Sequence, residues 1–109
     1  MRHGAQLLQG TLELLVLKTL SWEELNGFAI AQWIKERTAE DILIEEGALY
    51  PALHRLEQRG LIKGTWGVSE NKRKARFYRL TAAGRRELQA QEGNWAKYVR
   101  AVDRVLQPA

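Results

Sequence analysis

The segment Glu46-Gly-Ala-Leu-Tyr-Pro-Ala-Leu-His-Arg-Leu-Glu-Gln-Arg-Gly-Leu-Ile62 has the pattern of an amphipathic helix that runs into a strand. Pro51 lacks an amide N–H and fits a helix only near its first turn, so we expect the helix to begin at about Gly47 or Ala48. Gly60 is a natural stop for it. Three leucines recur at helical spacing and predict one buried stripe: Leu49, Leu53 and Leu56.

The face opposite this stripe carries small, aromatic and hydrogen-bonding groups, and few acids. A helix that enters a DNA groove needs such a front, but a solvated amphipathic helix has a similar pattern. Glu57 lies beside the stripe and not at the centre of the front. The residues expected on the front and at its flanks are Gly47, Pro51, His54, Arg55 and Gln58, with Ala48 and Tyr50.

Length and composition limit the class of protein. The 109 residues suffice for one domain, or for one domain and a long terminal helix, and the 45% hydrophobic and 28% charged content is typical of a globular protein in water. The chain has no cysteine, which excludes disulfides and thiolate metal sites and is compatible with a reducing cytoplasm. The first apolar run is interrupted by Gln9, Thr11 and Glu13 and is too polar for a signal peptide or a membrane span. We therefore expect a cytoplasmic protein without a membrane partner.

Two helices are predicted before the opening segment. Residues 9–20 are apolar on two sides, so this helix lies in the core or is shared with a partner subunit. Residues 28–37 predict a second, shorter helix, after a connection with the turn signal Asn26-Gly27. Ile42 and Ile44 alternate with their neighbours, as in a short edge strand.

After Gly60 the period of the pattern changes from helical to two. Residues 62–68 and 74–80 read as two strands joined by a polar tip, which is a β-hairpin. Residues 72–79 include five basic side chains and no acid. Such a concentration suits phosphate neutralisation with counterion release, and a solubilising edge that blocks aggregation is the alternative.

The last part of the chain, residues 81–109, is predicted as one long helix with Thr81 as its N-cap. Its apolar residues approximate a heptad seam, which would pair two copies of the chain. We therefore expect residues 81–109 to form a dimerisation helix. The seam consists of Leu88, Trp95, Tyr98, Val99, Val102, Val105 and Leu106.

Three helices followed by a hairpin is the order of a winged helix-turn-helix. In that arrangement the third helix enters the major groove and the hairpin, called the wing, reaches the DNA backbone or the minor groove. The fold class predicted here is mainly α with a small β-hairpin (α+β). Residues 1–80 are assigned to the winged helix-turn-helix DNA-binding domain.

With these segments in view, the chain resembles the PadR-type family of bacterial transcription regulators, in particular its short members. The resemblance covers most of residues 9–88 and rests on three stretches: Gly47-Ala-Leu-Tyr-Pro-Ala-Leu-His-Arg-Leu-Glu57 with Gly60-Leu-Ile62, Arg76-Phe-Tyr-Arg-Leu-Thr-Ala-Ala-Gly84, and Asn26-Gly-Phe-Ala-Ile30. Ala48 departs from the family, since many members have Ser or Thr there. The resemblance implies a dimeric, repressor-like protein that binds an inverted-repeat operator.

The same resemblance implies which side chains meet double-stranded DNA. His54 and Arg55 face outward and suit groove contacts, whereas Tyr50 lies at the flank and could instead pack on the wing. The wing cations are expected to touch phosphates, and so to position the protein without reading sequence. The implied DNA-binding residues are Tyr50, Pro51, His54 and Arg55 on the helix and Lys72, Arg73, Lys74 and Arg76 on the wing.

Four tryptophans raise the question of a ligand. Trp33 and Trp66 fall on apolar faces and are expected in the core, while Trp22 lies in a connection. Trp95 lies on the seam, where two copies could approach each other in a symmetric dimer. Some relatives are thought to bind planar aromatic effectors between such helices, and Trp95 resembles the residue that does so. The simpler interpretation is an ordinary aromatic residue of a dimer core.

Two other functions compete with that of a DNA-binding regulator. One is a winged-helix module used only for protein contact, with its basic wing on an acidic partner. The other is an enzyme, for which the sequence offers no phosphate-binding glycine loop, no nucleophile beside a base and no metal-spaced cluster. His54 is an unsuitable metal ligand, because the only other histidine is His3. We therefore expect no catalytic residue, no metal and no cofactor.

Overall fold

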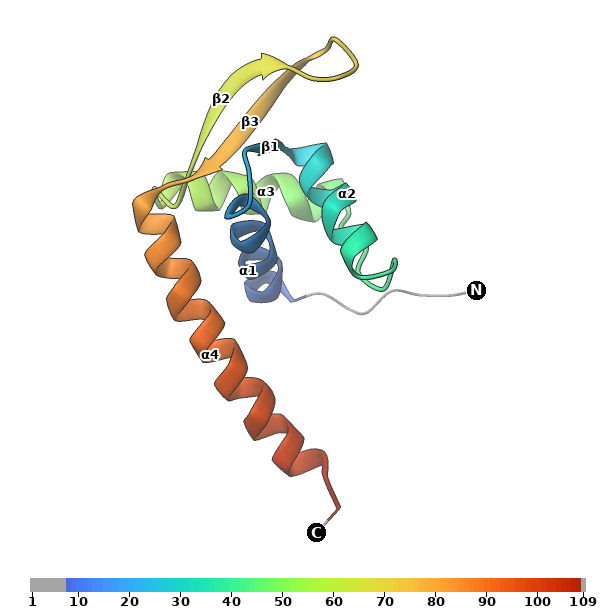
Figure 1. Cartoon of the computed structure of the whole chain (residues 1–109), viewed down its shortest axis with the longest axis vertical. Helices are drawn as coiled ribbons and strands as arrows, with labels where there is room; N and C mark the ends of the chain where they lie inside the picture. The colour runs from blue at the N-terminus through green and yellow to red at the C-terminus, as the bar shows by residue number, and fades with distance from the viewer. Residues whose placement is uncertain (1–7, 109) are drawn as a thin grey trace.

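The computed structural model describes residues 8–108, which form four helices and a three-stranded antiparallel sheet (Figure 1). The predicted α+β class is confirmed, and His3 lies outside the described residues. No helix in this part of the chain is long and apolar enough to cross a membrane. The elements are α1 (Gln9–Leu20), β1 (Leu25–Asn26), α2 (Gly27–Arg37), α3 (Glu46–Gln58), β2 (Ile62–Val68), β3 (Lys74–Leu80) and α4 (Ala82–Leu106).

Helix α1 is the centre of the packed body. It contacts α2, α3, α4 and β3, which explains its apolar residues on two sides. Val16 and Leu17 point in different directions from α1, and both are fully buried. The three leucines of α3 pack into the same core as Ile30 and Ile34 of α2.

The sheet has a strand that the sequence did not predict. Leu25–Asn26 pairs with β3, opposite Phe77 and Tyr78, and gives the strand order β1-β3-β2. The edge strand expected around Ile42 and Ile44 is wrong: this segment has no strand, and both side chains pack half-buried against the core. A strand of two residues is too short to show a period, so its signal was missed.

Helix α3 begins at Glu46, one residue earlier than expected. Pro51 therefore lies in the second turn and donates no hydrogen bond to the carbonyl of Gly47, which is in the exposed first turn. The predicted stop is confirmed. Gly60 has φ +72°, and the amide of Leu61 donates to the carbonyl of Leu56 over 3.0 Å.

The start of α4 is locked onto the end of α3. The Thr81 hydroxyl accepts a hydrogen bond from the Gly84 amide and donates one to the Gly60 carbonyl, over 3.0 and 2.7 Å. A Cβ at position 84 would lie 2.0 Å from the carbonyl oxygen of Leu61, so only glycine fits this contact. Beyond these first turns α4 extends away from the packed body (Figure 1).

Candidate nucleic-acid interface

The predicted front of α3 is exposed. Tyr50, Pro51, His54 and Gln58 are open to solvent, whereas the leucines on the opposite face are at most 2% exposed. The Tyr50 ring lies against the first residue of α2, since a Cβ at Gly27 would come within 2.9 Å of its Cε1 atom. The start of α2 therefore holds the Tyr50 ring at the edge of the front.

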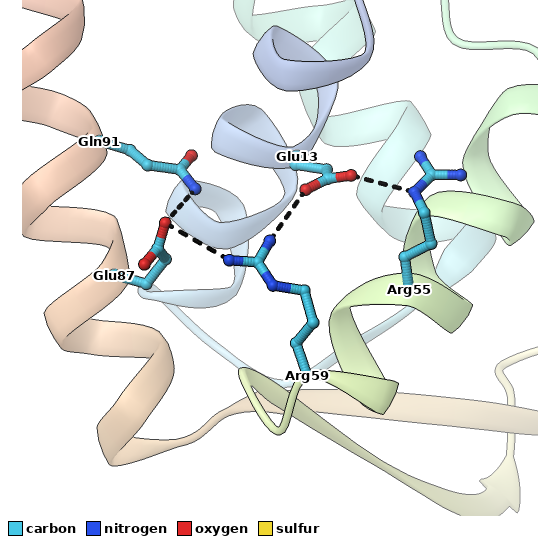
Figure 2. A network of polar contacts seen from close by, with 5 residues as sticks. All are labelled: Glu13, Arg55, Arg59, Glu87 and Gln91. Atoms are coloured by element: carbon cyan, nitrogen blue, oxygen red, sulfur yellow. Dashed lines mark hydrogen bonds and ion pairs between the residues drawn. The ribbon is translucent and has the colours of Figure 1, made fainter.

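Arg55, predicted to face outward, is half-exposed and makes an ion pair within its own chain. Its Nε atom donates to an oxygen of Glu13 on α1 over 3.1 Å. Arg59, just after α3, lies with one guanidinium nitrogen 3.4 Å from the other oxygen of Glu13 and a second nitrogen 3.7 Å from Glu87 on α4. Glu87 in turn accepts a hydrogen bond from Gln91 (Figure 2). Arg55 thus belongs to a polar network between α1, α3 and α4.

Glu13 is the residue that organises this network, and the sequence analysis missed it. Its side chain is only 11% exposed, and a carboxylate in such a place requires cationic partners. Two arginines supply these cationic partners: Arg55 in the last turn of α3 and Arg59 just after the helix ends. The signal that could have found the pairing is an acid inside the apolar stripe of the first helix.

On its other flank α3 is tied to the wing. A guanidinium nitrogen of Arg76 lies 2.6 Å from an oxygen of Glu57, and the amide of Gly64 donates to the same oxygen over 3.3 Å. The Arg76 hydrogen bond, helped by the Gly64 amide, holds the pKa of Glu57 below its usual value. Arg76 is therefore a link between wing and α3, and its charge is already matched by a carboxylate.

The wing tip carries cations that are free to bind an anion. Lys72, Arg73 and Lys74 are exposed, and within residues 8–108 none of them takes part in an ion pair. Two backbone hydrogen bonds of 2.8 Å between residues 69 and 72–73 close the tip, with Lys72 in the left-handed region at φ +58°. The hairpin therefore presents three solvated positive charges beside the front of α3.

The prediction that Trp66 belongs to the core is wrong. Its side chain is 62% exposed, whereas Trp33 packs against the core as predicted. Trp66 lies beyond the point where the sheet face is covered by α3. Trp22 is also 62% exposed and has Lys18 above its ring at 5.4 Å.

The winged-helix arrangement agrees with the comparisons of this chain with known proteins. The profile of the "Transcriptional regulator PadR-like family" matches residues 16–90, more than half of the chain. The chain belongs to the PadR-like family. Its members are transcriptional regulators, and the winged-helix architecture described above is theirs.

Solved structures of PadR-like and related regulators superpose on most of the chain. A transcriptional regulator from Clostridium thermocellum has a TM-score of 0.84 at 27% identity, covering 91% of this chain and 96% of its own. A PadR-like regulator from Bacillus cereus has a TM-score of 0.79 at 28% identity, with coverage of 96% and 100%. A PadR family regulator from Eggerthella lenta has 33% identity and a TM-score of 0.79, with coverage of 93% and 86%.

The outer half of α4 lies beyond the residues that the PadR-like profile matches. Here Trp95, Tyr98, Val105 and Leu106 are between 43% and 82% exposed, and Val99 and Val102 are half-buried. Leu88 differs from the rest of the expected seam, because it is 5% exposed and belongs to the core of its own chain. The apolar face available to a partner therefore begins after the first two turns of α4.

A pocket of about 330 Å³ lies between α1 and this part of α4. The rings of Trp95 and Tyr98, 6.1 Å apart, form part of its wall, together with Leu14 of α1. Glu13 and Gln91, both members of the polar network, also line it. The pocket is thus aromatic on one side and polar on the other.

Proposed function

We propose that this PadR-like regulator is a sequence-specific DNA-binding repressor that binds an inverted-repeat operator as a homodimer. The observation that supports the proposal is a group of three exposed cations on the wing, Lys72, Arg73 and Lys74, which pair with no acid within residues 8–108 and lie next to the exposed front of α3. Phosphates attract such cations and release counterions, while an open helix front of small and hydrogen-bonding groups can approach base edges.

The front of α3 and the wing have different roles in the proposed DNA binding. Tyr50, Pro51 and His54 are the groove contacts of α3, and the wing contacts phosphates through Lys72, Arg73 and Lys74. Arg55 and Arg76, expected at first to bind DNA, act mainly by holding α3 in place from its two flanks. This assignment follows from their carboxylate partners, at 3.1 and 2.6 Å.

A dimer suits this function because it presents two copies of α3. The exposed apolar residues of the outer α4 give each chain a surface for its partner, and pairing sets the two helices about one DNA turn, roughly 34 Å, or a multiple of it apart. A dimer bound across a promoter blocks polymerase, so repression is the default outcome. The proposal places this activity in the cytoplasm, beside the chromosome.

A planar aromatic effector is part of the proposal. The pocket beside Trp95 offers a ring for stacking, and a ligand there would change the separation of the two α3 helices and hence the affinity for DNA. Titration of planar aromatic compounds should quench tryptophan emission in the wild type. If Trp95→Phe left the response unchanged, Trp95 would have no role in effector binding.

The function is tested by retention of genomic fragments on purified protein at physiological salt, followed by sequencing. We expect enrichment of a few promoter fragments that share an inverted repeat. Lys72→Ala with Lys74→Ala should weaken binding to all duplexes and reduce the slope of log K against log salt by about 2 per protomer. Lys35→Ala with Arg37→Ala is the matched control, because it removes two charges from the last turn of α2, away from the wing.

Two results would contradict the proposal. Uniform retention of all fragments that disappears with added salt would leave only a basic surface. A winged-helix module for an acidic protein partner would then be the better description. An equal loss of salt slope in the control variant would show that net charge, and not the wing, determines binding.

A further inference from the structure

The inward face of the wing extends beyond the part that packs against the body in residues 8–108. In the hairpin, Trp66 lies opposite Arg76 and Gly64 opposite Tyr78, so Trp66 and Tyr78 are on one face of the sheet. Near α3 this face is core, and Tyr78 is 7% exposed. Farther out on the same face, Trp66 is 62% and Val68 70% exposed. The apolar face of the wing therefore extends beyond the part of it that packs against the body.

Trp66 is held in place by two cations. The Nζ atom of Lys74 lies 4.9 Å from the centroid of the Trp66 ring, and the guanidinium carbon of Arg76 lies 5.5 Å from it. Arg76 is fixed in turn by its 2.6 Å contact with Glu57 of α3. The indole is thus exposed, and two cations orient it.

The indole forms one wall of a cleft of about 400 Å³ between the wing, the start of α2 and α3. Three further aromatic residues line it: Phe28 of α2 at 71% exposure, Tyr50 of α3 at 47%, and the buried Tyr78 of β3. Arg73, Lys74 and Arg76 line it as well, and none of the acids in the described part of the chain does. Three open aromatic rings and three cations therefore surround one hollow.

We propose that this cleft holds the sugar–phosphate backbone of one DNA strand, with Trp66 packed against a deoxyribose and Lys74 and Arg73 on the phosphates at either side. The backbone of DNA alternates an anionic phosphate with an apolar sugar. The cations of the cleft lining match the phosphates, and its aromatic rings match the sugars. The cleft is also continuous with the front of α3 through Tyr50, so a strand leaving the groove at α3 passes through it. This inference rests on the proposed DNA binding and adds Trp66 and Phe28 to its contact residues.

The test compares Trp66→Ala with Trp22→Ala, whose side chain is equally exposed and also lies under a lysine. We expect Trp66→Ala to bind duplex DNA about tenfold more weakly, near the lower end of what an aromatic contact with a nucleotide contributes, and Trp22→Ala to bind as the wild type does. Trp66→Phe should recover most of the affinity. Quenching of tryptophan emission by DNA should be reduced in Trp66→Phe and retained in Trp22→Phe.

Inorganic polyphosphate separates the aromatic contact from charge. It carries the anions without the sugars, so Trp66→Ala and the wild type should bind it equally. An equal loss for polyphosphate and duplex would show that Trp66 only positions Lys74, and would overturn the inference. So would unchanged duplex affinity in Trp66→Ala, although DNA binding itself would then stand. A wild-type protein that binds no duplex would instead refute the proposed function.

Discussion

The wing and the outer half of α4 both project from the packed body, and both carry an exposed tryptophan. Trp66 on the wing has Lys74 and Arg76 over its ring, whereas Trp95 on α4 has the ring of Tyr98 6.1 Å away. The first setting suits a polyanion and the second suits an apolar partner. Trp66 and Trp95 are both exposed, so the difference between them lies in their neighbours: cations in a cleft for Trp66, and an aromatic ring on an apolar helix face for Trp95.

The two regions also differ in how they are anchored to α3. The wing is held through Glu57 and Arg76, whose side chains are 31% and 32% exposed. Helix α4 is held through Glu87, 32% exposed, which contacts Arg59 just after α3. Arg59 also contacts Glu13 of α1, which is 11% exposed. Because water competes less for a buried carboxylate, the contact with Glu13 should stabilise the body more than the wing contact does.

The largest expected effect comes from breaking the apolar surface of α4. Val105→Asp with Leu106→Asp places two charges where the side chains are 82% and 74% exposed, so the fold of the single chain should not change. The charges would be buried in a dimer, and we expect monomers instead. Loss of the second α3 should lower operator affinity by about 100-fold or more. Light scattering after gel filtration and DNA titration measure the two effects.

Gln107→Asp with Pro108→Asp is the matched control, because it adds the same charge at two exposed positions just after α4. It should leave the oligomeric state unchanged and weaken DNA binding only slightly. A double Val105/Leu106 variant that stays dimeric would move the interface to another surface. Equal behaviour of the two variants would attribute the loss to charge alone.

Periodicity predicted the elements of this fold well where they are long. The first helix and both wing strands have the predicted bounds, because each contains enough turns or alternations to show its period. Local sequence signals predicted two helix ends. Gly60, in the left-handed region, ends α3, and Thr81 caps the start of α4. A strand as short as Leu25–Asn26 contains no period and depends on β3 as a neighbour, so the sequence could not reveal it.

For Trp66 and Arg55 the sequence pattern lacks the tertiary contacts that determine their surroundings. Strand alternation placed Trp66 on the inward face, but it does not say where along that face the core ends. A helical angle placed Arg55 on the front, but its long side chain bends to a carboxylate 42 positions away in sequence. His54, Lys72 and Lys74 are exposed as expected, and no carboxylate within residues 8–108 forms an ion pair with them. The sequence pattern predicts the face on which a side chain lies, but tertiary contacts determine the final position of a flexible or large side chain.

A smaller effect is expected from Glu13→Gln, which keeps the shape and removes the charge that Arg55 and Arg59 share. We expect the free energy of unfolding to fall by about 2 kcal/mol, because both guanidinium groups lose a charged acceptor in a poorly hydrated place. Glu87→Gln is the control, since Glu87 is 32% exposed and 3.7 Å from Arg59, and it should cost less than about 1 kcal/mol. Urea unfolding of both variants measures the difference. Equal losses would mean that burial of Glu13 adds nothing.

The smallest effect concerns the anchor of the wing and is revealed by pH. The contact with Arg76 lowers the pKa of Glu57, so the unfolded chain binds a proton at this site more readily than the folded one. The stabilisation is therefore present above the unfolded pKa and is lost as pH falls through the lower, folded value. Since the pair is about one-third exposed, solvent screens it and we expect its contribution to be small. The difference in unfolding free energy between the wild type and Glu57→Gln should shrink steadily on acidification below about pH 5. A difference that stays constant would show that the carboxylate charge does not hold the wing, and that the Gly64 amide and the strand pairing hold it instead.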